Sequence, residues 1–271
     1  MKRGITISKI TMMRILRDKD PEGGPFLLIF ESVILLWMVA KKITSLQHPN
    51  ISRWVQLRQD RAYREEAQRV LVAGEKMVRE LPLEVLITVE PSDIAAKEKY
   101  LVSEAILKKI TGLSQPDGFA AEVRLPPPQD LCSKKFLVIL DQIGDPGNLG
   151  TVLRTALALG WEGVIVTPGT VDVFNDKALR AGKGAQFHLP YARMEMEEIK
   201  RLKLQFYMAD VGGEPVSKVS FRAPLALILS SEAHGPSSDI GRKVTIPMNK
   251  SVESLNVAAS GAILLYAMRP Q

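Results

Sequence analysis

The stretch LDQIGDPGNLGTVLRTALALG, Leu140 to Gly160, decides the fold of the chain. The apolar run FLVIL at 136–140 leads into it and predicts a strand of a parallel sheet that is covered on both faces. The residues DPG at 145–147 predict a turn, and Asn148 is then expected to cap a helix by accepting a backbone N–H. Apolar side chains recur after it at helical spacing: Leu149, Val152, Leu153, Ala156 and Leu157. The stretch therefore predicts one strand–turn–helix unit of an α/β sheet.

Further apolar runs downstream predict the rest of that sheet. Strands are expected at 163–168, 204–210, 225–230 and 244–248, and a closing helix is expected from Ser254 to Met268. Alternation of strands with helices is typical of an α/β domain, which we place at 134–271.

The region before it predicts a smaller α/β domain at 43–125. A helix is expected over 50–66, strands over 69–74 and 84–90, and further helices over 75–81 and 103–113. Three consecutive prolines open a stiff linker at 126–133, which separates the two domains.

Residues 1–42 differ from the rest of the chain and are interpreted as an appendage. The first 17 residues carry five basic side chains and no acidic one, as mitochondrial presequences do. The apolar run at 26–40 contains Glu31 and is shorter than the roughly 20 residues that cross a membrane. We therefore expect a mitochondrial or plastid address, or otherwise the cytoplasm, and no membrane partner.

Charge and cysteine content narrow the classes of protein. The formal net charge is +6, which fits an acidic partner such as RNA only weakly because the surplus is spread along the chain. Arginines are locally enriched at 53–69, either as a solvated helix face or as contacts to an RNA backbone. A single cysteine, Cys132, and three scattered histidines exclude a disulfide framework and a cysteine-rich zinc site, so no metal is expected.

Three segments carry polar residues that could do chemistry at the edge of the larger sheet. Arg154 lies off the apolar stripe of its helix, either as a surface arginine or directed toward the edge where open α/β sheets bind ligands. The turn after 225–230 carries Glu232 and Gly235, either as an ordinary strand end or as a ligand loop. The patch around Asn256 is rich in small residues, which let a helix pack closely on another backbone.

In sequence order, these segments resemble the SpoU (TrmH-like) RNA 2′-O-ribose methyltransferases of the SPOUT class. The first motif of the family matches N-x-G-x-x-x-R at 148–154, the second matches E-x-x-G at 232–235, and the third matches IPM…SLNVA at 246–258. The segment at 176–190, centred on Arg180, also resembles a family segment. Four matches in order over residues 136–269 are highly specific.

The resemblance implies a deep trefoil knot in the C-terminal parallel-sheet domain, a homodimer, S-adenosylmethionine as the cofactor and RNA (tRNA or rRNA) as the substrate. It implies cofactor contacts at Ser230, Ile246 and Leu255. Arg154 is the expected catalytic residue, and four residues would position it and the ribose: Asn148, Glu232, Ser254 and Asn256. The region 43–125 resembles the RNA-binding domain of such enzymes. This favours substrate contacts by Arg53, Arg58 and Arg61, and the family segment at 176–190 adds Arg180.

The sequence departs from the family pattern on the cofactor side. Ser230 and Lys250 stand where glycine is usual, Gly182 replaces a frequent serine, and the segment between Glu232 and Ile246 is short. Two alternatives stay open: a non-catalytic RNA-binding protein that keeps the knot, and a methyltransferase that acts on a base or a protein. A nicotinamide oxidoreductase is disfavoured because the sequence lacks the G-x-G-x-x-G fingerprint.

Overall fold

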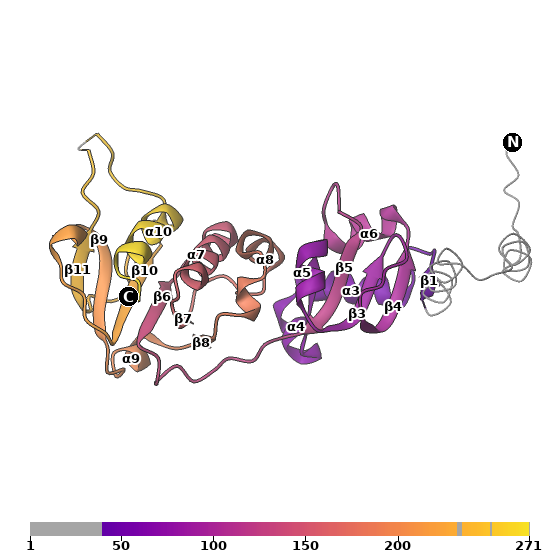
Figure 1. Ribbon diagram of the computed structural model, residues 1–271, viewed down its shortest axis with the longest axis horizontal. Helices are drawn as coiled ribbons and strands as arrows, with labels where there is room; N and C mark the ends of the chain where they lie inside the picture. Colours follow the sequence, from indigo (N-terminus) through magenta and orange to yellow (C-terminus); the bar gives the residue numbers. More distant parts are fainter. Residues whose placement is uncertain (1–39, 232–234, 250, 271) are drawn as a thin grey trace, which may run out of the picture.

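The computed structural model describes residues 40–231, 235–249 and 251–270. Two sheets follow one another along the chain and lie side by side along its long axis, joined by an extended segment (Figure 1). The expected targeting segment and most of the apolar run at 26–40 lie outside the described residues. Within those residues, none of the helices is long and apolar enough to cross a membrane.

The first sheet has five strands in the order β1-β4-β3-β5-β2. Their bounds are β1 (Lys41–Ile43), β2 (Arg69–Ala73), β3 (Leu83–Thr88), β4 (Ala96–Val102) and β5 (Phe119–Arg124). β1, β4 and β3 run parallel, whereas β5 is antiparallel to both β3 and β2. The sequence pattern does not predict β1, β4 or β5, because charged residues such as Lys97 and Glu122 interrupt their apolar runs.

The helices of this first part are α3 (Pro49–Gln59), α4 (Arg61–Ala67), α5 (Glu75–Glu80) and α6 (Glu104–Thr111). The prediction of one helix over 50–66 is wrong, because the backbone of Asp60 is extended and ends α3. The Asp60 side chain accepts the Tyr63 N–H at 3.2 Å and so caps α4. Apolar residues of α3 and α6, among them Trp54 and Ile110, are buried against one face of the sheet.

The second sheet has six strands in the order β11-β9-β10-β6-β7-β8, and every pairing in it is parallel. Their bounds are β6 (Phe136–Asp141), β7 (Gly163–Val166), β8 (Tyr191–Arg193), β9 (Gln205–Pro215), β10 (Leu225–Ser230) and β11 (Arg242–Thr245). The expected parallel α/β sheet is confirmed. Because all the strands are parallel, their carboxyl ends meet at one edge, where open α/β sheets bind ligands.

The second sheet packs against α7 (Pro146–Ala158), α8 (Asp176–Gly182), α9 (Met196–Ile199) and α10 (Val257–Ala267), with short 3₁₀ turns at Ala185–Phe187 and Val216–Lys218. Successive side chains of β6 alternate between two clusters. Val138 and Leu140 join the cluster that contains the apolar residues of α7 and α10, and Leu137 and Ile139 join the cluster that contains Ile199. Both faces are therefore covered, as the continuous apolar run at 136–140 predicts.

Two predicted helix ends need correction. Asp145 caps α7 in place of Asn148, because the Asp145 carboxylate accepts the Asn148 backbone N–H at 2.7 Å and Pro146 opens the helix. The last helix begins at Val257 and not at Ser254, because Asn256 is its cap.

Two glycines of the motif segments allow close packing. A Cβ atom on Gly150 would lie 2.3 Å from the carbonyl oxygen of Ala178, so any side chain there would force α7 away from α8. A Cβ on Gly261 would lie 2.9 Å from Leu229 Cδ1, which fits the predicted close packing of α10. Thus α7 packs closely on α8, and α10 packs closely on the carboxyl end of β10.

Candidate active site

A pocket of about 290 Å³ lies at the carboxyl edge of β9, β10 and β11, beside α10. Ser230, Ile246 and Leu255, the three residues expected to bind a cofactor, all line it. Ser254 lines it as well. Several apolar side chains complete the wall: Val211, Leu229, Val244, Met248, Val257 and Leu264. A mostly apolar cavity with a few polar groups is the usual form of a small-molecule site.

Ser230 supplies a polar group that has no partner within the described part of the chain. Its hydroxyl oxygen is buried and makes no hydrogen bond there. Leaving a buried hydroxyl without a hydrogen bond costs about 1–3 kcal/mol, so such groups normally find a partner. Because Ser230 is the last residue of β10 and lines the pocket, a ligand with polar atoms would complete its bonding. The residues present therefore fit a small polar cofactor, although serine replaces the usual glycine.

Residues of the first and third motifs meet at the N-termini of α7 and α10. The Asn256 side-chain amide donates to Asn148 Oδ1 at 3.1 Å. The Asn256 carbonyl oxygen Oδ1 accepts the backbone N–H groups of Ala258 at 3.0 Å and Ala259 at 3.4 Å. The oxygen of Asn256 thus caps its own helix while its nitrogen holds Asn148. Ser254 and Leu255 line the pocket, and Asn256 is the next residue in the chain. The Asn148–Asn256 pair therefore lies beside the pocket.

Arg154 is exposed on α7, further along the same helix as Asn148. It forms no ion pair with any residue of the described ranges, which leaves its guanidinium available to a substrate. Ser254 is likewise exposed. Glu232 and Lys250, the remaining motif positions, lie outside the described residues.

The four arginines expected to touch RNA are engaged within the protein. Arg53 forms two bonds to the buried Glu122 carboxylate, at 2.6 and 3.2 Å. Arg61 binds Glu65 at 2.9 Å, and Arg180 binds Asp176 at 2.8 Å. The Arg58 guanidinium packs directly on Gly112. Their contact with RNA stays a prediction: three of them bind carboxylates of the chain itself, and the buried Nε of Arg58 makes no hydrogen bond within the described residues.

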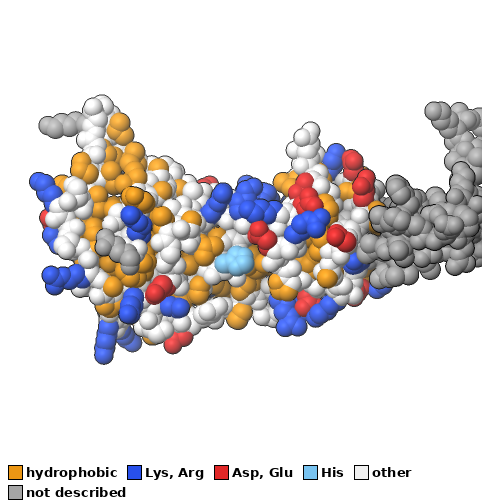
Figure 2. Space-filling view, viewed as in Figure 1, with side chains coloured by type: hydrophobic (Ala, Val, Ile, Leu, Met, Phe, Trp, Pro, Cys, Tyr) orange, Lys and Arg blue, Asp and Glu red, His pale blue; other side chains and the backbone are white. Residues whose placement is uncertain are grey.

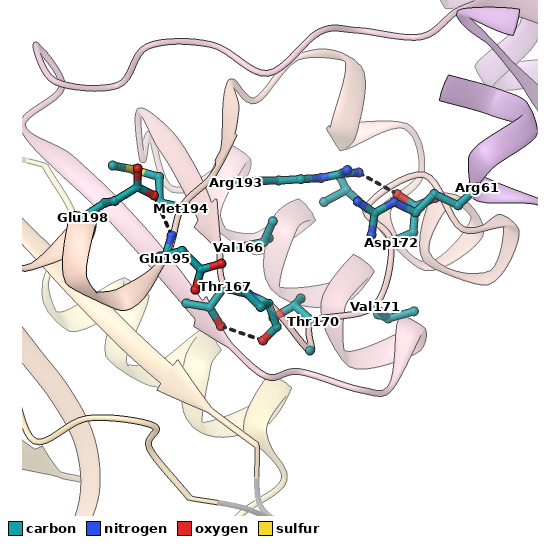
Figure 3. A pocket seen from close by; sticks show the side chains of 13 residues that line it. Arg61, Val166, Thr167, Thr170, Val171, Asp172, Arg193, Met194, Glu195 and Glu198 are labelled. Atoms are coloured by element: carbon teal, nitrogen blue, oxygen red, sulfur yellow. Dashed lines mark hydrogen bonds and ion pairs between the residues drawn. The ribbon is translucent and has the colours of Figure 1, made fainter. Parts of the chain in front are cut away.

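A cluster of ion pairs that the sequence does not predict lies between the two sheets. Arg64 of α4 binds Asp172 at 2.5 Å, and Arg193 of β8 binds Asp172 at 3.3 Å and Glu65 at 2.6 Å. A cavity of about 410 Å³ opens beside this cluster, lined also by Arg61, which approaches from the first part of the chain (Figure 3). Because these partners are far apart in sequence, no local pattern could have revealed them.

The parallel sheet and the pocket at its carboxyl edge, bordered by polar side chains from separate loops, define an α/β protein with a pocket fit for a small molecule where such sheets bind ligands. A model of the SpoU rRNA methylase family matches residues 135–266. The 23S rRNA (guanosine(2553)-2′-O)-methyltransferase RlmP of Bacillus subtilis is 32% identical over 248 residues, which are 84% of this chain and 99% of that protein. The chain belongs to the SpoU rRNA methylase family.

Solved structures agree with this assignment. The crystal structure of an AdoMet-bound rRNA methyltransferase from Sinorhizobium meliloti is 27% identical, with a TM-score of 0.75, over 84% of this chain and 97% of that one. The crystal structure of an RNA 2′-O ribose methyltransferase is also 27% identical, with a TM-score of 0.69, over 84% of this chain and 98% of that one. The expected class, an RNA methyltransferase that uses S-adenosylmethionine, is confirmed.

Proposed function

We propose that the protein transfers a methyl group from S-adenosylmethionine to the ribose 2′-hydroxyl of an rRNA nucleotide. The observation that carries this proposal is the bond between Asn148 and Asn256 next to a pocket lined by Ser230, Ile246 and Leu255. The Bacillus subtilis relative, matched over 99% of its length, is named as a 23S rRNA 2′-O-methyltransferase, which supports rRNA over tRNA.

Ser230, Ile246 and Leu255 would hold the cofactor. The buried Ser230 hydroxyl would make the hydrogen bond that it lacks, and Ile246 and Leu255 would pack against apolar parts. When bound, S-adenosylmethionine supplies an activated methyl group.

Arg154 would act on the substrate side. A ribose 2′-hydroxyl is a weak nucleophile, so it must be oriented and must lose its proton as it attacks. Because an arginine guanidinium stays protonated in proteins, Arg154 is a poor base on its own. Its role would be to hold a phosphate or an oxygen next to the reacting hydroxyl by charge-assisted hydrogen bonds. Four residues would position Arg154 and the ribose: Asn148, Glu232, Ser254 and Asn256.

A trefoil knot and a homodimer belong to the same proposal. The packing of α10 against α7 and β10, reached after the chain has passed β11, supports a knotted C-terminal segment. Two apolar side chains of α10 are exposed, Ile263 to 44% and Tyr266 to 58%, which supports a second copy covering this helix. Figure 2 shows hydrophobic side chains gathered over the C-terminal elements. Light scattering in solution would test the dimer.

Two further parts of the proposal concern the first segments of the chain. The part at 43–125, which carries the five-stranded sheet, would bind RNA, with 126–133 as the linker to the methyltransferase domain at 134–271. The basic first residues would direct the protein to a mitochondrion or plastid. Microscopy of a fluorescent fusion, with and without residues 1–42, tests that address.

The test of the reaction is transfer of a labelled methyl group to rRNA by the wild type, by Arg154→Ala and by Arg201→Ala. Arg201 is exposed, and its side chain makes no hydrogen bond or ion pair in the described ranges, so it serves as the matched control. We expect transfer by the wild type and Arg201→Ala, and at least a hundredfold less by Arg154→Ala. Digestion of the product should release a 2′-O-methyl nucleoside, and a methylated base would point to the other class of methyltransferase. RNA binding without any transfer would mean a non-catalytic protein.

A further inference from the structure

Asp141 is a buried carboxylate at the centre of the ligand-binding edge. It is the last residue of β6, and its exposed fraction is 0%. Burying a carboxylate costs several kcal/mol unless it is paired or fully hydrogen-bonded. Asp141 forms no ion pair with a cation of the described residues, so neutral donors must satisfy it.

Three donors reach the Asp141 carboxylate, from two different loops. Oδ1 accepts the hydroxyls of Thr167 at 2.8 Å and Ser237 at 2.9 Å. Oδ2 accepts the backbone N–H of Ser237 at 2.7 Å. The backbone carbonyl of Asp141 accepts the N–H of Ser231 at 3.1 Å. One residue therefore fixes the chain at Ser231 and again at Ser237.

The described residues next to these two attachments belong to the cofactor side of the site. Ser231, Gly235 and Pro236 line the pocket. Glu232, the second-motif residue, directly follows Ser231 in the sequence. The Asp141 carboxylate is also oriented by the hydroxyl of Thr167, which donates to it. The oxygen of that hydroxyl accepts the N–H of Gln142 at 3.1 Å. Asp141 thus connects the wall of the cofactor pocket to the end of β7.

We infer that Asp141 is a positioning residue, which holds Ser231 and Ser237 at the distance that shapes the cofactor pocket. This inference rests on the proposed function, because it assigns Asp141 to the pocket in which S-adenosylmethionine would bind. A carboxylate accepts all three hydrogen bonds, whereas an asparagine of the same size keeps the packing but has one acceptor oxygen: if that oxygen accepts the Ser237 N–H, its NH₂ group takes the place of the oxygen that accepts the two hydroxyls.

The test compares Asp141→Asn, Ser237→Ala and the double variant with the wild type. We expect the Kd for S-adenosylmethionine, measured by calorimetry, to rise about tenfold in Asp141→Asn and about threefold in Ser237→Ala. The double variant should be no weaker than Asp141→Asn, because both changes break the same contact. The Kd for rRNA should change less than twofold, which general unfolding would not produce. Asp239→Asn, at an exposed position nearby, should bind as the wild type does.

Two outcomes would overturn the inference. One is an unchanged cofactor Kd in both single variants. The other is an equal loss of cofactor and RNA binding in Ser237→Ala, which keeps the buried carboxylate and its backbone bond. Exchange of the Ser237 amide hydrogen gives a readout that does not need the reaction, and it should be faster in Asp141→Asn. If the wild type binds no S-adenosylmethionine, the proposed function fails, whereas the amide exchange still tests whether Asp141 holds Ser237.

Discussion

Replacing Asp172 with alanine should weaken the junction between the two sheets. The Arg64 side chain is 3% exposed and Asp172 is 10% exposed, and their closest nitrogen and oxygen atoms are 2.5 Å apart. In Asp172→Ala the Arg64 guanidinium stays buried without its counter-charge. It keeps its hydrogen bonds to the carbonyl oxygens of Leu57 and Arg58, both at 2.9 Å.

The size of the effect follows from this burial. Breaking a buried ion pair by removing one partner costs about 3–5 kcal/mol. The two remaining carbonyl bonds of Arg64 favour the lower end, about 3 kcal/mol. Arg193 loses only its bond of 3.3 Å to Asp172 and keeps the bond of 2.6 Å to Glu65, so it adds little. For a protein of this size, 3 kcal/mol corresponds to a fall in Tm of roughly 6–12 °C.

Urea and thermal unfolding, followed by circular dichroism, measure this loss. Glu197→Ala is the control: it removes a surface pair with Lys200, in which Glu197 is 74% exposed, and should leave the urea midpoint and the Tm close to those of the wild type. Adding Arg64→Met to Asp172→Ala should recover most of the stability, because no buried charge is then left unpaired. If Asp172→Ala unfolds within about 1 kcal/mol of the wild type, the reasoning about the buried charge is refuted.

Three further outcomes are expected. Gly150→Ala should lower the free energy of unfolding by about 1–3 kcal/mol, because its Cβ would lie 2.3 Å from the Ala178 carbonyl oxygen; an unchanged urea midpoint would contradict the close packing of α7 and α8. Asn256→Asp should keep the cap of α10 but lose the donor to Asn148, so kcat should fall while Tm changes little. Asn256→Ala should lose the cap as well, at a cost of about 1 kcal/mol of stability. Equal Tm values for both variants would argue against the cap. Lys97 and Arg124 hold the pKa of Glu84 at about 2, below its ordinary 4.5. The stabilising contribution of Glu84 is therefore complete above pH 4.5 and is lost as the pH falls toward 2. Acid unfolding of Glu84→Gln should be less steep in that window, and unfolding curves identical to those of the wild type would exclude this role.

Local patterns in the sequence predict those parts of the fold that local forces decide. The apolar run at 136–140 and the helical spacing after it give β6 and α7, because burial of an apolar face determines both. The helix caps show the limit of such reasoning. Asp60 splits one predicted helix into two, and Asp145 displaces Asn148 as the cap of α7, since each aspartate accepts the backbone N–H three residues further on and so starts a helix at its own position.

The candidate site, too, could be predicted from the sequence only in part. The motif resemblance identifies Ser230, Ile246 and Leu255, and these residues do line one pocket. The contacts that build the site join residues far apart in the chain, such as Asp141 with Ser237, and a single sequence carries no signal for them. The partner of Arg53 is equally hidden, because a glutamate in the run FAAEVR gives no sign that it will be buried.

The pairing of the arginines has a consequence for how the protein would respond to salt. Arg53, Arg61 and Arg180 each face a carboxylate of their own chain, so little of their charge is left to displace counterions from a nucleic acid. The affinity of a protein for RNA falls with salt in proportion to the number of phosphates that it neutralises. These three arginines should therefore add little to the dependence of RNA affinity on ionic strength, and any contact that they make with the substrate would rest on shape and hydrogen bonding more than on attraction at a distance.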